Sequence, residues 1–279
     1  MKIAITGASG YVGAALTKHL LAQKHSVTEL SRSSDCSPQI DYSNANELLA
    51  ELQGHQALVH LIGKTHSQDS MEALADYREI NVELSKTIAK AAAKAGIKTF
   101  IYLSSIKAMG ENRPTPYQAD DTPAPTTAYG ISKLEAEKAL QSICDRSGMK
   151  LIIIRPPLIY SPTAKGNIEQ LKRVLLKGIP LPLKSIRNKR SIVTLADLCK
   201  IIQISLEKKT GQCLLLPGSP PSLSTPELIE RIASDNSLSS FMIPFPTIFL
   251  KAGLSCLGKS ETHRKLCGSL EIVPNITTY

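Results

Sequence analysis

Short apolar runs alternate with longer segments of helical periodicity along the first two-thirds of the chain. The apolar runs predict strands at Lys2–Ile5, Ser26–Leu30, Ala57–Leu61, Thr99–Leu103 and Leu151–Ile154. The segments between them predict helices at Val12–Gln23, Asn46–Gln53, Met71–Ala95 and Ala128–Ser147. Because the strands are almost continuously apolar and alternate with helices, the pattern predicts an α/β fold with a doubly wound parallel sheet.

The pattern changes after Arg155, where prolines become frequent. A helix, a strand-helix pair and a short apolar strand are predicted at Asn167–Lys177, Ser191–Thr194, Ala196–Glu207 and Cys213–Leu216. We interpret the last three as a return to the sheet. The sequence therefore predicts a main domain at residues 1–156 plus 189–217, and a small, discontinuous C-terminal lobe at residues 157–188 plus 218–279.

The charge balance favours anionic partners. The chain has 33 Lys and Arg against 24 Asp and Glu, which gives a net charge of +9. The basic residues are dispersed, however, and no basic cluster with interleaved aromatic residues occurs, as nucleic-acid binding would require. We therefore expect phosphorylated small molecules as ligands and no nucleic acid.

No membrane span or metal site is expected from the sequence. The longest apolar stretch, Phe241–Leu257, is interrupted by two prolines and a lysine, so it reads as a surface patch or as part of a lobe core. Lys2–Ile5 already reads as a buried strand, which leaves no room for a signal peptide. The six cysteines form no CxxC pair, and no carboxylate completes a ligand set with His60 and His66. Free thiols in a cytoplasmic protein are the simplest interpretation.

A glycine-rich turn follows the first predicted strand. Gly7, Gly10 and Gly13 stand three residues apart, between that strand and the first predicted helix. Glycines let the backbone turn tightly and approach a pyrophosphate, while the helix directs its N-terminal N–H groups at the anion. The segment therefore predicts a dinucleotide-binding loop of the Rossmann type, with a purely structural glycine turn as the alternative.

The end of the second predicted strand bears on which dinucleotide binds. A carboxylate at this place accepts hydrogen bonds from the ribose hydroxyls of NAD, whereas an arginine pairs with the 2′-phosphate of NADP. This chain has Ser31 and Arg32 there, and Glu29 lies too early on the strand. The pattern favours NADP(H) and leaves NAD(H) possible; in the alternative interpretation, Arg32 is a solvated surface charge.

Three side chains suggest proton transfer. Tyr129 and Lys133 stand four residues apart on one predicted helix face, so the ammonium can favour the phenolate of a tyrosine whose ordinary pKa is about 10. Ser105 follows the fourth predicted strand, at the sheet edge where such folds place active groups. Its hydroxyl could hold a substrate carbonyl while Tyr129 donates the proton.

Together, Thr6–Gly13, Leu103–Ser105, the Tyr129 and Lys133 pair and Arg155–Pro157 resemble the extended short-chain dehydrogenases/reductases. Over nearly its whole length the chain is similar to their nucleotide-sugar epimerase/dehydratase/reductase branch. The segments Ser104–Gly110, Arg155–Tyr160, Pro180–Leu183 and Asn188–Ser191 are similar to bacterial UDP-sugar 4-ketoreductases of the UDP-N-acetylquinovosamine type. The resemblance implies an enzyme of surface-polysaccharide biosynthesis, such as that of O-antigen.

The resemblance also assigns site residues. It implies a catalytic set of Ser105, Tyr129 and Lys133. With the glycine loop and the end of the second strand, the expected cofactor contacts are Gly7, Gly10, Tyr11, Val12, Gly13, Ser31, Arg32, Asp41, Tyr42, Leu61, Ile62, Gly63, Asn81, Tyr129, Lys133 and Pro156. The expected substrate contacts are Ser105, Lys107, Asn167 and Arg190. For Lys107, an ordinary exposed lysine is an equally good interpretation. A homodimer through Met71–Ala95 and Ala128–Ser147 is a further implication.

Three functions remain open at this point. The first is an NADP(H)-dependent reductase of a UDP-linked 4-keto sugar. The second is a UDP-hexose 4-epimerase like the UDP-glucose 4-epimerases; those retain NAD through an acidic residue that Ser31 replaces here. The third is a cofactor-sensing protein without turnover, favoured only by a lobe that we expect to be C-terminally shortened, because relatives continue beyond the last segment that matches.

Overall fold

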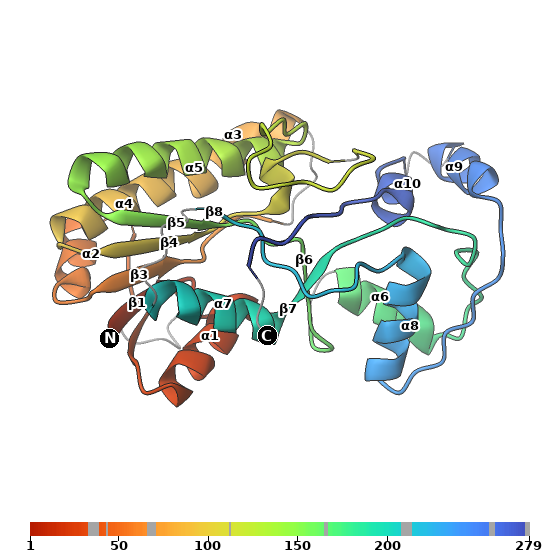
Figure 1. Cartoon of the computed structure of the whole chain (residues 1–279), viewed down its shortest axis with the longest axis horizontal. Coiled ribbons are helices and arrows are strands. Elements are labelled where there is room, and N and C mark those ends of the chain that lie inside the picture. Colours follow the sequence, from red (N-terminus) through yellow and green to blue (C-terminus); the bar gives the residue numbers. More distant parts are fainter. Residues whose placement is uncertain are drawn as a thin grey trace.

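The centre of the structure is a six-stranded parallel sheet with the strand order β2-β1-β3-β4-β5-β8 (Figure 1). Its strands are β1 (Lys2–Thr6), β2 (Ser26–Leu30), β3 (Ala57–His60), β4 (Thr99–Leu103), β5 (Lys150–Ile154) and β8 (Leu214–Leu215). This computed structural model describes residues 1–32, 39–42, 44–65, 71–111, 113–164, 167–207, 214–256 and 260–276. The doubly wound parallel sheet predicted from the alternation of apolar runs and helices is confirmed.

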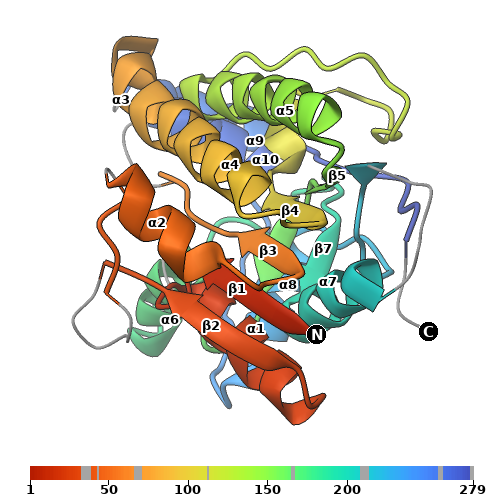
Figure 2. The ribbon, with the colours of Figure 1, turned by 90° about the vertical axis from the view of Figure 1, so that its left-hand side faces the viewer.

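Helices cover both faces of the sheet (Figure 2). They are α1 (Tyr11–Ala22), α2 (Ala45–Leu52), α4 (Leu84–Lys94), α5 (Ala128–Ser147) and α7 (Leu195–Glu207). Leu16 of α1 and Ile201 of α7 belong to the hydrophobic core on one face, whereas Leu48 of α2, Ile88 of α4 and Leu140 of α5 belong to the core on the other. All five side chains are fully buried, which explains why the helical periodicity could be read from the sequence.

The predicted helix Met71–Ala95 is divided into four helical segments. A 3₁₀ turn at Met71–Ala73 leads into α3 (Leu74–Arg78), which is followed by a π-helical turn, Glu79–Glu83, and then by α4. The hydrophobic periodicity shows a helix but does not show the one-residue widening of a π turn. Such turns are frequent at functional sites, and this one carries Asn81.

A smaller lobe lies beyond the carboxyl ends of the strands, on the right in Figure 1. Its elements are β6 (Leu158–Tyr160), α6 (Asn167–Leu176), β7 (Ile192–Thr194), α8 (Thr225–Asp235), α9 (Thr247–Cys256) and α10 (Ser260–Cys267). Side chains of β6, α6, β7 and α8 share one hydrophobic cluster. Within the described part of the chain, none of the helices combines the length and the apolar character that a membrane span requires.

One strand prediction is wrong. Ser191–Thr194 was expected to return to the main sheet, but β7 pairs in parallel with β6 in a separate two-stranded sheet. Pro156 and Pro157 follow β5 and have no N–H groups with which to continue a ladder, so the chain leaves the main sheet there. The edge beside β5 is taken by β8, which pairs through Ile153 with Leu214 and Ile154 with Leu215.

The strand order sets the position of a ligand crevice. β1 pairs with β2 on one side and with β3 on the other, so the chain winds outward in both directions from β1. Beyond β2, Ser31 forms a parallel bridge with Gln39. In open parallel sheets, ligands bind outside the carboxyl ends of the strands at such a reversal point, which here lies between β1 and β3.

Candidate active site

The glycine loop lies at the reversal point of the sheet. Gly7 has a φ of +76°, and a Cβ there would lie 3.1 Å from the Ile62 backbone nitrogen, in the loop after β3. The Gly10 N–H donates to the Gly7 carbonyl at 3.0 Å and closes the turn. A Cβ on Gly13 would lie 2.2 Å from the Gly7 oxygen and 2.6 Å from the Ala8 Cα. Only glycine permits this close approach of α1 to the loop.

The loop and the start of α1 together suit a pyrophosphate. Gly10 is the N-cap of α1 and supplies no side-chain cap, so the N–H groups of the first helical turn face the loop without a side-chain acceptor at that position. A helix N-terminus of this kind attracts an anion. Val12 of the first turn packs against the hydrophobic core, whereas Tyr11 packs against the lobe cluster.

The end of β2 opens into a cavity of about 370 Å3, lined by Arg32, Gln39, Ile40, Asp41 and Glu47. The Ser31 hydroxyl contacts the Ser9 hydroxyl at 2.8 Å, which ties the β2 end to the glycine loop. Tyr42 is buried, and its hydroxyl donates to the Leu30 carbonyl at 2.7 Å, so its ring is fixed in the core below this cavity. The structure therefore brings the Arg32 cation and the Asp41 carboxylate to one small hollow.

The proposed catalytic residues come from β4 and α5. Ser105 follows β4 and begins a short 3₁₀ turn, where its Oγ accepts the Lys107 N–H at 3.2 Å. Tyr129 and Lys133 lie in the first two turns of α5, which starts at the N-cap Thr127. The Tyr129 ring contacts the Tyr77 ring at a centroid separation of 5.9 Å and is only partly buried. The partly exposed hydroxyl of Ser105 and the partly exposed phenol of Tyr129 can both meet a ligand, since neither residue is enclosed in the core.

Lys133 is buried almost completely. Its Nζ donates to the Tyr102 hydroxyl at 3.0 Å and to the Leu103 carbonyl at 2.8 Å. Burial lowers the pKa of this ammonium to about 7, while the Glu137 carboxylate, one turn along α5, acts in the opposite direction. Tyr102 was not predicted as a site residue. Strand alternation could have identified it, because Phe100 and Tyr102 both face the helix layer that contains α5.

A chain of hydrogen bonds connects the sheet with α5. Burial, and then the Lys133 charge, lower the pKa of His60 to about 3, so the ring is neutral. Because the Ser85 hydroxyl donates to the Asn81 carbonyl at 2.7 Å, it accepts from His60 Nε2 at 2.8 Å. The Thr6 hydroxyl then donates to His60 Nδ1 at 2.7 Å. The His60 ring stacks on Tyr102 at 5.6 Å and so supports the phenol that contacts Lys133.

Asn81 in the π-helical turn continues this network. Its amide Nδ2 donates to the Ser132 hydroxyl at 2.9 Å, and Ser132 donates to the Tyr129 carbonyl at 2.8 Å. Its Oδ1 accepts the Lys64 N–H at 2.8 Å and fixes the loop after β3. A Cβ on Gly63 in that loop would lie 3.2 Å from the Lys133 Nζ. Gly63 therefore passes directly beside the lysine, while Leu61 and Ile62 lie beside Gly7 of the glycine loop.

A buried ion pair between Arg155 and Glu137 lies beside the end of β4. Arg155 donates through Nε and Nη2 to the two Glu137 carboxylate oxygens at 2.9 and 2.5 Å. The Ser104 hydroxyl donates to the same carboxylate, and the neighbouring Pro156 carbonyl accepts the Ile106 N–H at 3.0 Å. These contacts connect β4, α5 and β5 directly below Ser105. Pro156 is buried, so the backbone at this position is held firmly.

On the lobe side, Glu111 connects the two parts of the molecule. Its carboxylate contacts the Lys107 Nζ at 2.6 Å and the Arg264 guanidinium of α10 at 3.7 Å. The Lys107 Nζ also lies 5.9 Å from the centre of the Tyr129 ring. Lys107 is therefore a half-buried, paired lysine beside the proposed proton donor. Glu111 and Arg264 were not identified from the sequence. The four-residue spacing of Lys107 and Glu111 could have indicated their ion pair, whereas the contact with Arg264 depends on how the lobe folds back on the sheet.

The two expected diphosphate residues lie in different lobe segments. Arg190 bridges Leu223 and Leu270 through its backbone, and burial lowers the pKa of its guanidinium, while Cys267 and Glu111 act in the opposite direction. Asn167 is the first residue of α6, and its side chain lies outside the described part of the chain. Arg190 thus faces the group of charges around Glu111, whereas the position of the Asn167 amide is not described.

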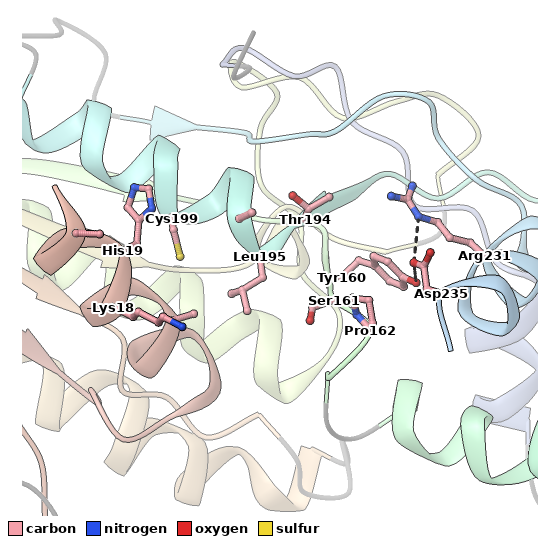
Figure 3. A pocket seen from close by; sticks show the side chains of 13 residues that line it. Lys18, His19, Tyr160, Ser161, Pro162, Thr194, Leu195, Cys199, Arg231 and Asp235 are labelled. Atoms are coloured by element: carbon pink, nitrogen blue, oxygen red, sulfur yellow. Dashed lines mark hydrogen bonds and ion pairs between the residues drawn. The ribbon is translucent and has the colours of Figure 1, made fainter. Parts of the chain in front are cut away.

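A cavity of about 580 Å3 lies elsewhere, between α1, α7, the end of β6 and α8 (Figure 3). Tyr160 donates to the Asp235 carboxylate at 2.5 Å at its lobe end, and His19 and Cys199 lie at its sheet end. None of the residues that the sequence predicts for the site lines this cavity. It separates the lobe from α1 and α7 and does not belong to the candidate active site.

Comparison with known proteins agrees with this geometry. Residues 3–213 match the NAD dependent epimerase/dehydratase family. A UDP-glucose 4-epimerase of Vibrio cholerae is 33% identical over 97% of this chain and 86% of its own length. An N-acetyl-α-D-glucosaminyl-diphospho-ditrans,octacis-undecaprenol 4-epimerase of Escherichia coli O157:H7 is 24% identical over 88% of this chain and 76% of its own.

A solved structure shows the same fold. The UDP-N-acetylglucosamine 4-epimerase from Bacillus cereus superposes with a TM-score of 0.76, at 22% identity, over 96% of this chain and all of that one. The family match covers most of the chain and includes the glycine loop, Ser105, Tyr129 and Lys133. The chain belongs to the NAD dependent epimerase/dehydratase family, whose members are enzymes of the extended short-chain dehydrogenase/reductase fold.

Proposed function

We propose that this protein transfers a hydride at C4 of a UDP-linked hexose, and that it acts as an NADP(H)-dependent reductase of a 4-keto sugar in bacterial surface-polysaccharide synthesis. The observation that carries the cofactor preference is the end of β2, where Ser31 and Arg32 stand in place of a carboxylate. Arg32 lines a cavity that is large enough for a phosphate group. The names of the relatives, which are nucleotide-sugar and sugar-diphosphate epimerases, support the substrate class.

The residues of the glycine loop fit a dinucleotide. The backbone from Gly7 to Gly13 turns tightly without any side chain at the three glycines, and a Cβ on Gly7 or Gly13 would collide with or crowd the neighbouring backbone. Leu61 and Ile62, in the loop after β3, lie beside this turn, and Asn81 holds that loop in place. When bound, the nicotinamide supplies the hydride for reduction of the ketone.

Tyr129 would donate the proton that accompanies hydride transfer. Reduction of a ketone places negative charge on the carbonyl oxygen, which the Tyr129 phenol neutralises by proton donation. The phenolate left behind is stabilised by protonated Lys133, one helical turn away on α5. The Ser105 hydroxyl would hold the same oxygen in place. Lys107, Arg190 and Asn167 would receive the nucleotide diphosphate and the sugar on the lobe side.

Replacement of Arg32 with Ala tests the cofactor preference. Loss of a charge-assisted contact should weaken NADPH binding by roughly 1.5–3 kcal/mol and should leave NADH binding nearly unchanged. Arg146→Ala, in an exposed residue of α5, is the matched control, and fluorescence titration of both cofactors provides the measurement. Equal losses of affinity for NADPH and NADH would show that Arg32 does not contact the 2′-phosphate.

A second candidate function is a UDP-hexose 4-epimerase. It is favoured by the 33% identity with the Vibrio cholerae UDP-glucose 4-epimerase over nearly the whole chain. An epimerase removes a hydride from C4 and returns it to the other face, so it has no need to exchange its cofactor. Purified protein that carries tightly held NAD⁺ and interconverts UDP-glucose and UDP-galactose would establish the epimerase. Protein that exchanges NADP(H) freely would support the reductase.

The remaining expectations stay proposals. Helices α4 and α5 lie side by side on the outside of the sheet, which suits a homodimer formed through them (Figure 2). We still propose a main domain at residues 1–156 plus 189–217 and a lobe at residues 157–188 plus 218–279. Within the first of these, β7 is an exception, because it pairs with β6 of the lobe. A cytoplasmic location would agree with soluble nucleotide-sugar substrates.

A further inference from the structure

Exposed apolar side chains are concentrated at one end of the lobe. Phe241, Ile243, Phe245, Ile248 and Phe249, which we call the α9 face, are exposed by 59, 37, 36, 71 and 63%. The chain has only four phenylalanines, and three of them lie here. Leu176 and Ile179 are also exposed, at 68 and 50%. Elsewhere in the described residues, exposed large apolar side chains are few and scattered, so this concentration requires an explanation.

The segment that carries the α9 face is hydrogen-bonded to the rest of the lobe. The Phe241 carbonyl accepts the Leu181 N–H at 2.8 Å, and the Ile243 N–H donates to the Leu181 carbonyl at 2.9 Å. The Phe245 N–H donates to the Ser185 hydroxyl at 3.1 Å, and its ring meets the Phe249 ring edge-on at 6.3 Å. The backbone is therefore fixed by the lobe while the aromatic rings remain outside.

α9 itself presents this face away from the sheet. None of its residues is buried, although Leu250 packs against the lobe cluster and the helix contacts α10. Figure 1 shows α9 at the end of the molecule that is farthest from the sheet. A helix in a folded lobe normally buries an apolar stripe of its own, so the exposed Ile248 and Phe249 are available for an external surface.

The two stretches of chain that form the α9 face and pair with it carry charges of one sign. No Asp or Glu occurs between Glu169 and Asp197, nor between Asp235 and Glu261. Lys177, Lys184, Arg187 and Lys251 are exposed in these two stretches. The Lys184 N–H donates to the Ile243 carbonyl at 3.2 Å, which places this lysine directly beside the apolar residues. Exposed apolar rings with exposed cations in the same two stretches suit a surface that is apolar inside and anionic outside.

We propose that the α9 face docks on the surface of an anionic lipid bilayer. Phenylalanine and isoleucine side chains would enter the boundary between headgroups and acyl chains, and the lysines and arginine would contact lipid phosphates. A second copy of the chain is disfavoured as the occupant, because a two-fold interface would bring the same cations against each other. This inference goes beyond the proposed function and does not depend on it.

Vesicle flotation tests the proposal. The purified chain should float with phosphatidylcholine vesicles that contain phosphatidylglycerol and remain behind with phosphatidylcholine alone, and added salt should reduce the bound fraction. The double variant Ile248→Ser with Phe249→Ser should lower the partition coefficient at least about tenfold. The matched control is Leu21→Ser with Met71→Ser. Both are exposed apolar side chains outside the face, and this variant should bind vesicles like the parent.

A second pair of variants tests the charge. Lys184→Glu with Lys251→Glu should abolish flotation. The control is Lys24→Glu with Lys98→Glu, two exposed lysines outside the face and outside α4 and α5, which changes the net charge equally and should preserve most of the flotation. Thermal melting and turnover of a soluble nucleotide sugar should be unchanged in all four variants, which separates this proposal from the proposed reaction. Absence of flotation with anionic vesicles, or equal losses in face and control variants, would overturn it. The proposal would also be overturned if the parent forms a dimer that the Ile248 and Phe249 changes dissociate, and if the parent does not bind vesicles.

Discussion

At the scale of single residues, Lys133 has a role that conflicts with its surroundings. The proposed chemistry needs its positive charge beside Tyr129, yet burial lowers its pKa to about 7. Two groups compensate in part: the Tyr102 hydroxyl and the Leu103 carbonyl both accept hydrogen bonds from Nζ. The spacing of Tyr129 and Lys133 could be read from the sequence. Strand alternation places Tyr102 on the face toward α5, but neither pattern shows that Lys133 meets Tyr102 and Leu103, some 30 residues earlier.

Tyr129→Phe tests the proton donor. The ring and its contact with Tyr77 remain, so folding and NADPH binding should survive, while the chemical step should slow by about 10²–10⁴-fold. Single-turnover kinetics with a UDP-linked 4-keto sugar provide the measurement. Lys133→Met should have a comparable effect, and Ser105→Ala a milder one, because Tyr129 can still contact the carbonyl oxygen. Near-normal turnover in Tyr129→Phe would mean that the proton comes from another group.

The lowered pKa of Lys133 also makes a prediction about stability. Between pH 7 and 10.5 the unfolded chain holds a proton on this lysine that the native chain has released, so the lysine contributes more stability as pH rises. Relative to Lys133→Met, the parent should gain about 2 kcal/mol in the free energy of unfolding between pH 7 and pH 9. Urea denaturation at both pH values measures this, with Lys138→Met on the same helix as the control. A difference that is independent of pH would show that the native lysine stays protonated.

At the scale of elements, buried apolar runs predicted β2 and β4 to the residue and most other strands within one. The prediction failed for β7, because an apolar run of three residues does not specify which strand it pairs with. The π-helical turn at Glu79–Glu83 was also missed. It holds Asn81 against Ser132 of α5 and Lys64 of the loop after β3, contacts that depend on the folded chain and not on local periodicity.

Gly13→Ala tests the close approach of α1 to the glycine loop. The added Cβ would overlap the Gly7 oxygen and the Ala8 Cα, so the helix must shift. We expect a loss of roughly 1–3 kcal/mol in stability and a loss of dinucleotide binding. Gly253→Ala in α9 is the control, since nothing lies within 4 Å of its Cβ, and it should stabilise the chain by about 0.5–1 kcal/mol. Unchanged cofactor affinity in Gly13→Ala would place the dinucleotide elsewhere.

At the scale of the whole molecule, the lobe and the sheet meet around Glu111. This carboxylate contacts Lys107, two residues after Ser105, and Arg264 of α10, and its charge acts on Arg190. A substrate with a diphosphate would lie among these cations, with its sugar directed at Ser105 and Tyr129. The sequence indicated Arg190 and Lys107 only through a family resemblance, because both depend on how the discontinuous lobe folds back on the sheet.

In the function proposed above, the chain reduces C4 of a nucleotide-linked keto sugar with an exchangeable cofactor. The most direct test supplies NADPH that carries two deuterium atoms at nicotinamide C4, so that either face delivers deuteride, together with a UDP-linked 4-keto-6-deoxyhexose, and examines the product by NMR. We predict one deuterium at the sugar C4 in each product molecule. Product without deuterium, or interconversion of UDP-glucose and UDP-galactose with no deuterium uptake, would contradict the reductase and favour the epimerase.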